Sequence, residues 1–176
     1  GEVARYMSRH AGRHVSKAVL VSSVVPFMLR TPDNPEGTDA AVFDDMAAGL
    51  KEDRAKFFTG FAKDFYGVGI MSHPVSAEML DWTRGLAMQA SLKATLACAK
   101  SFATTDFRRD LAAFKVPTLI VHGTDDKTVP IDASGRAAAA GIANSTLIEY
   151  DGAPHGLFAT HKERLTSDLL QFIRSA

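Results

Sequence analysis

The chain has 176 residues, of which 46% are hydrophobic and 23% are charged, a composition typical of a globular protein and not of a disordered or fibrous one. Its 20 basic and 20 acidic residues give a formal net charge of zero, and the basic residues never form a run. We therefore expect neither a nucleic acid nor a membrane as a partner.

The first predicted element is a helix over residues 2–10, in which Val3, Tyr6 and Met7 recur at helical spacing. No side chain in front of it could act as an N-cap, and Gly12 is placed to end it. We therefore expect this helix to continue a turn that lies upstream.

Three short apolar runs predict β-strands, at residues 17–23, 117–123 and 145–150. The first two carry apolar side chains on both faces, which is typical of parallel strands covered by helices on each side. The third is more polar and suits a place nearer an edge. Helical patterns at residues 132–141 and 162–173 follow the second and third strands, and this alternation predicts an α/β sheet.

More than ninety residues separate the first strand from the second. They show helical periodicity at 42–65 and 75–102, which is too long for a crossover helix and predicts a helical insertion over the end of the sheet. We therefore divide the chain into residues 1–23, which begin the core, the insertion at 24–110, and residues 111–176, which complete the core.

Two loops directly after predicted strands carry the candidate catalytic residues. The loop at 122–130 contains Asp125 and Asp126, and the loop at 151–156 contains His155. Parallel strands direct their carboxyl ends at a common crevice, where a carboxylate can orient an imidazole whose ordinary pKa of about 6.5 suits proton transfer. Taken singly, the Asp125–Asp126 loop is better explained as a turn than as a catalytic loop, and His155 is explained equally well as a surface histidine.

Asp126 precedes His155 by 29 residues, and one predicted helix and one predicted strand fill the gap. Two loops separated by a single parallel unit lie side by side at the sheet edge. An acid and a histidine there supply two of the three groups of a nucleophile–histidine–acid relay. A metal site is disfavoured, because no Cys or His cluster supplies further ligands.

The order acid, then histidine, on the last two strands is that of the α/β-hydrolase fold. Within that fold the chain resembles the cofactor-free haloperoxidase and arylesterase group over essentially its whole length. The likeness is carried by GEVARY at residues 1–6, ATLAC at 94–98, FATTDFR at 102–108 and DGAPHG at 151–156.

In this group a Gly-x-Ser-x-Gly-Gly-Gly string forms the nucleophile elbow, and Gly1 corresponds to its last glycine. The resemblance therefore places the serine and both oxyanion-hole donors before Gly1. It implies that Asp126, at the Asp-x-x-Val-Pro position, is the acid and that His155 is the general base. It also implies that residues 1–23 form two elements: the helix that follows the elbow, and then the sixth strand of the sheet. The N-terminal portion of the same enzyme is then an expected partner, as a second chain or as a preceding segment.

The resemblance also implies that the insertion is a helical cap over an acyl pocket. The implied reaction is hydrolysis of small aryl or alkyl esters, with a perhydrolase side activity that makes peracids from short carboxylic acids and hydrogen peroxide. No metal and no organic cofactor are implied. The candidate pocket residues are Val24, Val25, Phe27, Met28, Phe61, Trp82 and Val129.

Two alternatives stay open. A dehalogenase has the same fold with an aspartate nucleophile, and a chain without a nucleophile could be an interaction module instead of an enzyme. Self-association into a homo-oligomer is also left open. Ser22 and Ser23 lack the elbow sequence that exposes a nucleophile, and we expect His122 to bond locally. The only cysteine, Cys98, is expected to be a small core residue, and a lone thiol is typical of a cytoplasmic protein.

Overall fold

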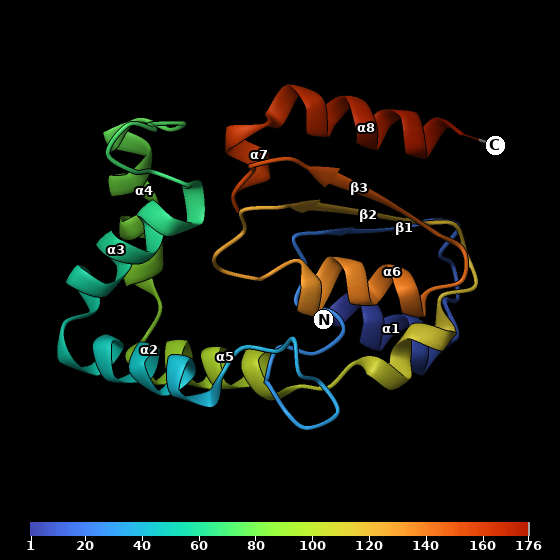
Figure 1. Cartoon of the computed structure of the whole chain (residues 1–176), viewed down its shortest axis with the longest axis horizontal. Coiled ribbons are helices and arrows are strands. Elements are labelled where there is room, and N and C mark those ends of the chain that lie inside the picture. The colour runs from blue at the N-terminus through green and yellow to red at the C-terminus, as the bar shows by residue number, and fades with distance from the viewer. Residues whose placement is uncertain (176) are drawn as a thin grey trace.

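The computed structural model describes residues 1–175, which form a parallel sheet with helices on both faces and a group of helices at one end of it (Figure 1). The sheet contains β1 (Ala18–Val21), β2 (Thr118–Gly123) and β3 (Ser145–Tyr150), in the order β1-β2-β3. Both pairings are parallel, with Val19 opposite Leu119 and Leu119 opposite Thr146. The predicted α/β sheet is confirmed.

Helices cover the two faces of the sheet differently. α1 (Glu2–His10) and α6 (Ala137–Gly141) lie on one face, and α8 (Lys162–Arg174) lies on the other (Figure 1). All six residues of β2 are buried, as expected for a central strand. At β1, Val21 is 37% exposed, and no element within residues 1–175 pairs with the second edge of the strand.

The first helix spans the predicted residues 2–10, but its end differs in detail. Ala11, and not Gly12 alone, takes the left-handed conformation, with φ of 50°. The Gly12 amide then donates to the carbonyl of Met7 at 3.0 Å, which satisfies a carbonyl that the helix leaves free.

The insertion folds into α2 (Ala40–Glu52), α3 (Arg54–Tyr66), α4 (Ala77–Gln89) and α5 (Leu92–Thr104). Each predicted helical stretch is thus divided in two by a polar residue that caps the second helix. The Asp53 carboxylate accepts the Lys56 amide at 2.9 Å, and the Ser91 hydroxyl accepts the Ala94 amide at 3.1 Å. These side chains satisfy amides at the helix starts and stabilise the breaks.

Cys98 is exposed on α5, so the expectation that it belongs to the core is wrong. α5 packs against α2 through a side that includes Phe102, whose ring lies 5.9 Å from that of Phe43. Trp82 on α4 is also exposed, at 58%, and is not among the residues that line the cavities described below.

Three short helical segments complete the fold: the 3₁₀ helix η1 (Arg108–Ala113), the π-helical turn η2 (Asp132–Arg136) and α7 (Leu157–Thr160). The predicted helix at 132–141 is therefore a π-helical turn followed by α6. Within residues 1–175, no helix has both the length and the apolar character that crossing a membrane requires.

Tyr150, at the end of β3, links the sheet to α8 through side-chain contacts. Its side chain is fully buried, its hydroxyl donates to Asp168 at 2.6 Å, and the Arg164 guanidinium lies 3.8 Å from the centre of its ring. Burial, and then the bond to Asp168, raise the pKa of Tyr150 above its usual range. The ring and its hydroxyl therefore both contact α8.

We predict that Tyr150→Phe lowers the free energy of unfolding by about 1–2 kcal/mol, because the ring still packs but the Asp168 carboxylate loses a donor. Urea unfolding of the complete protein at neutral pH measures the change. Thr59→Val is the control, since the exposed Thr59 hydroxyl bonds the Ala55 carbonyl within its own helix. Its effect should stay below about 0.5 kcal/mol, and equal losses in both variants would contradict the assignment.

Candidate active site

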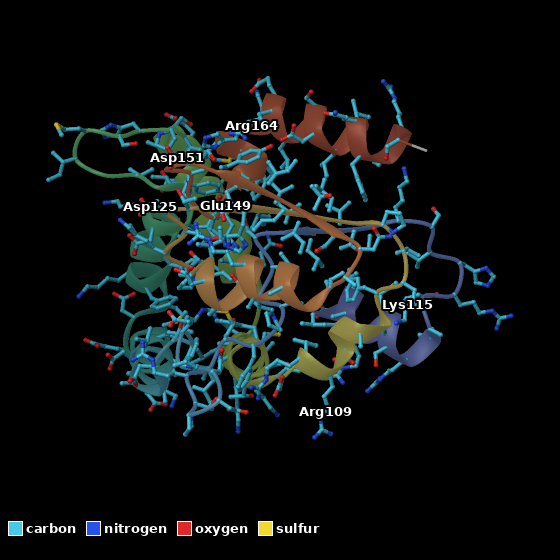
Figure 2. All side chains as sticks on the ribbon, turned by 45° about the vertical axis from the view of Figure 1, so that its right-hand side comes forward. Arg109, Lys115, Asp125, Glu149, Asp151 and Arg164 are labelled. Carbon is cyan, nitrogen blue, oxygen red and sulfur yellow. The ribbon has the colours of Figure 1, made fainter. Side chains whose placement is uncertain are left out.

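The candidate site lies in the two loops that follow β2 and β3. Figure 2 shows Asp125 and Asp151, one from each loop, near the same end of the sheet. The strand pairing continues into the loops, because the Thr124 amide donates to the Tyr150 carbonyl at 2.9 Å and the Asp125 amide donates to the Ala153 carbonyl at 3.1 Å. The loops therefore lie side by side, as the sequence predicts.

Gly123 makes this close approach possible. A Cβ atom at this position would lie 2.1 Å from the carbonyl oxygen of Ala153 and 2.8 Å from that of Pro154. A side chain there would push the two loops apart. The glycine at the end of β2 thus brings the histidine-bearing loop within reach of the loop that carries the acid.

Asp126 and His155 form a hydrogen bond between Oδ2 and Nδ1 at 2.8 Å. The Asp126 side chain is fully buried, and that of His155 is 17% exposed. Asp125 is 60% exposed and faces Lys127 instead. The predicted contact is confirmed, with Asp126 and not Asp125 as the acid partner. Because Nδ1 is held by the carboxylate, Nε2 is the ring nitrogen left for proton transfer.

The Asp126 carboxylate accepts hydrogen bonds at both oxygens. Oδ1 accepts the amides of Thr128 at 2.9 Å and Val129 at 2.7 Å, and Oδ2 lies 3.2 Å from Nε2 of His122 as well as near His155. Burial alone would raise the pKa of Asp126, but the bonds from the two histidines and the Val129 amide outweigh it and hold that pKa below its usual value. The carboxylate is therefore kept ionised.

His122 is a contact of the acid that the sequence prediction missed. Its expected local bond is present, since Nε2 lies 2.9 Å from the Val129 carbonyl oxygen, but its proximity to Asp126 was not foreseen. The available signal was a histidine in an otherwise apolar strand, four residues before the acid.

Phe65, at the end of α3, was also missed. Its ring centre lies 4.7 Å from that of His155, and its carbonyl accepts the Gly156 amide at 2.8 Å. A row of three rings, Phe57, Phe61 and Phe65, leads along α3 to the histidine, with neighbouring centres 5.9 and 6.0 Å apart. The helical insertion therefore packs directly against the histidine loop.

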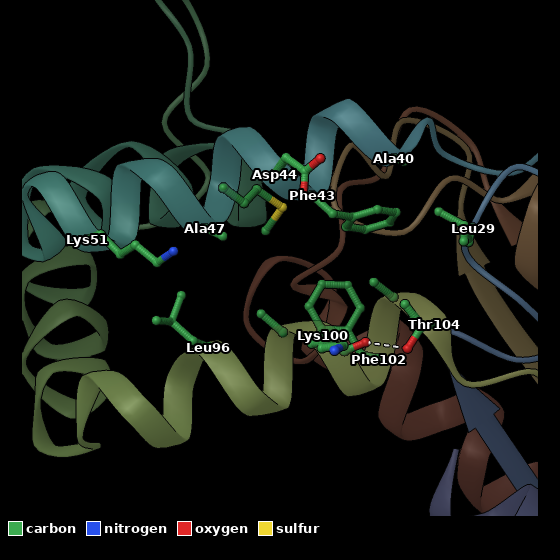
Figure 3. Close-up of a pocket in the computed structure, with 13 residues that line it drawn as sticks. Leu29, Ala40, Phe43, Asp44, Ala47, Lys51, Leu96, Lys100, Phe102 and Thr104 are labelled. Atoms are coloured by element: carbon green, nitrogen blue, oxygen red, sulfur yellow. Dashed lines mark hydrogen bonds between the residues drawn. The ribbon is translucent and has the colours of Figure 1, made fainter.

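A cavity of about 430 Å³ lies between α2 and α5, with Phe43 and Phe102 on opposite sides of it (Figure 3). Its lining is mainly apolar, and Asp44, Lys51 and Lys100 contribute charged side chains. Such a cavity has the size of a small-molecule site.

None of the predicted pocket residues Val24, Met28, Phe61 and Val129 lines this cavity. Val24 is half-buried, and Met28 is buried beside Leu29, which does line it. Phe61 borders a smaller cavity of about 90 Å³, and Val129 is buried next to Asp126. A pocket role for these four residues stays a prediction. Residues 1–175 contain no group of three His, Cys, Asp or Glu side chains placed to hold a metal ion.

Comparison with known proteins identifies relatives of this chain. The family model described as alpha/beta hydrolase fold matches residues 1–162. A non-heme chloroperoxidase of Streptomyces lividans is 42% identical over 99% of the chain, and a bifunctional esterase/perhydrolase of Acinetobacter calcoaceticus is 41% identical over 99%. The crystal structure of a bromoperoxidase from Bacillus anthracis superimposes with a TM-score of 0.95 at 39% identity, over 99% of the chain. The chain spans 64% of the length of each of these three relatives.

We predict that Asp126 stabilises the fold in a pH-dependent way. Because its pKa is lower in the folded protein than its usual value, its contribution is complete above that value and is lost as the pH falls through the folded pKa. The difference in unfolding free energy between the native protein and Asp126→Asn should be full above about pH 5 and shrink below about pH 4. Urea unfolding at a series of pH values measures it. Asp125→Asn, at an exposed carboxylate of the same loop, is the control for the substitution itself. A difference for Asp126→Asn that grows on acidification would contradict the assignment.

Proposed function

Because the chain belongs to the α/β-hydrolase fold family, we propose that it forms the acid- and histidine-bearing part of a serine-type hydrolase of small carboxylic esters. The observation that carries this proposal is the 2.8 Å bond between buried Asp126 and partly exposed His155 at the end of two parallel strands. Relatives named chloroperoxidase and esterase/perhydrolase support the same acyl-transfer chemistry.

In the proposed reaction a serine oxygen attacks the ester carbonyl and His155 accepts its proton at Nε2. The histidine returns that proton to the departing alcohol, and Asp126 holds the ring and stabilises its protonated form. Water then hydrolyses the acyl-enzyme. When hydrogen peroxide replaces water in this step, the product is a peracid, which accounts for a perhydrolase side activity without any cofactor.

We propose that the serine comes from an N-terminal portion of the same enzyme, as a second chain or a preceding segment. The greater length of the relatives supports this proposal. So does the exposed apolar surface of α1 and β1, which includes Val3, Tyr6 and Val21 and borders a hollow of about 460 Å³. α1 runs back along the sheet, so its first residue points toward the end at which the strands stop (Figure 1).

A cytoplasmic location is part of the proposal. It is supported by the single, exposed Cys98, which suits a reducing compartment.

In the complete enzyme, His155→Ala should lower kcat/KM for a 4-nitrophenyl ester by about 10³-fold or more, because the serine loses its base. Asp126→Asn should be comparably severe, because an amide permits the wrong imidazole tautomer. Asp125→Asn is the matched control and should stay within about twofold. Activity that survives His155→Ala to within about tenfold would exclude the mechanism.

Residues 1–176 expressed alone should aggregate, because the free edge of β1 and the apolar surface beside it invite intermolecular pairing. Co-expression with the N-terminal portion should give a soluble complex with esterase activity. Size-exclusion chromatography and an ester assay distinguish the outcomes. If the isolated chain is a monomer that melts cooperatively, the proposed need for a completing segment is wrong.

A further inference from the structure

His122 is fully buried at the end of β2, and one of its ring nitrogens faces only acceptors. Nε2 lies 2.9 Å from the Val129 carbonyl oxygen and 3.2 Å from Oδ2 of Asp126. A carbonyl and an ionised carboxylate cannot donate, so Nε2 must carry a proton. Nδ1 has no hydrogen-bond partner within the described residues. The geometry therefore selects the tautomer protonated at Nε2.

The π-helical turn η2 holds the other side of the ring. A Cβ atom at Gly135 would lie 2.8 Å from Nδ1 and 3.0 Å from Cγ of His122. The backbone of this turn therefore packs against the imidazole, and only a glycine permits it. A π-helical turn is an uncommon structure that often occurs near functional sites.

Of the two carboxylates near His122, only Asp126 is placed to interact with the Nε2 proton of this histidine. Glu149 lies opposite His122 in the strand register, but the guanidinium of Arg136 binds its two oxygens at 2.8 and 2.6 Å. His155 and His122 share Oδ2 of Asp126, at 2.8 and 3.2 Å.

We propose that His122 is a positioning residue that acts on His155 through Asp126. Its Nε2–H donates to the Val129 carbonyl at 2.9 Å and lies 3.2 Å from the oxygen that receives the His155 Nδ1–H, while two amides hold Oδ1, so the carboxylate is fixed in orientation. The N–H dipole beside Oδ2 also reduces the negative potential that this oxygen exerts on His155. His122 thereby adjusts how strongly His155 retains the proton that it takes from the nucleophile. This inference rests on the proposed function, in which His155 is the base.

The test compares His122→Leu with His122→Gln in the complete enzyme, because a glutamine amide can return an N–H to the position of Nε2. His122→Leu should lower kcat by about tenfold with KM within about twofold. The acidic limb of its pH–rate profile should move to higher pH, because the full carboxylate charge then acts on the protonated His155. His122→Gln should recover most of kcat and return the limb toward its original position.

Gly135→Ala provides an independent variant, since it displaces the His122 ring without removing a polar group, and it should lower kcat in the same way. Gly85→Ala is its control, because a Cβ atom at that position would meet nothing within 4 Å. Titration of active sites with an organophosphorus ester corrects kcat for any unfolded fraction. If the leucine variant does not fold, the glutamine and alanine variants decide the question.

Unchanged kcat and an unmoved acidic limb in His122→Leu would overturn the proposal, as would a glutamine variant impaired as severely as the leucine variant. The far-downfield NMR signal of the His155 Nδ1 proton gives a readout that needs no turnover. It should shift in both His122→Leu and Gly135→Ala, and its constancy would also overturn the proposal. If the unmodified complete protein has no esterase activity, the proposed function is refuted instead. The NMR comparison then still tests whether His122 acts on the Asp126–His155 bond.

Discussion

The hydrogen bond between Asp126 and His155 joins two loops that leave different strands, and it requires those loops to converge to 2.8 Å. The parallel pairing of β2 with β3 supplies most of this precision, because backbone hydrogen bonds continue from the strands into both loops. Gly123 supplies the rest by leaving space for the Ala153 carbonyl. The acid is then held by backbone amides, so its position depends on the fold of the core and not on flexible side chains. This is the arrangement expected of a preorganised site.

The helical insertion packs directly against this site. Phe65 contacts the His155 ring with its own ring and binds the Gly156 amide with its carbonyl. Any movement of α3 would therefore act on the loop that carries the histidine. The cavity between α2 and α5 lies in the same insertion, in which apolar side chains surround a space of about 430 Å³. In the proposed reaction the core holds the proton-transfer pair, Asp126 and His155, and the insertion supplies the apolar cavity.

Much of this arrangement could be predicted from sequence because it depends on local patterns. The β-branched runs gave the strands, and the positions of Asp126 and His155 directly after two of them gave their contact. What could not be predicted depends on packing between distant segments. Phe65 reaches His155 only through the path of the insertion, and the exposure of Cys98 depends on how closely the insertion helices pack around it. The contact of His122 with Asp126 also depends on how the loop folds back after β2.

The central claim is that Asp126 and His155 serve a serine nucleophile that residues 1–176 do not include. Covalent labelling of the complete protein with an organophosphorus ester, followed by peptide mass spectrometry, tests it most directly. The account predicts one label, on a serine shortly before Gly1 in the complete chain, and loss of labelling in His155→Ala. A label on a residue within 1–176, an active enzyme that takes no label on serine, or full labelling without His155 would contradict it.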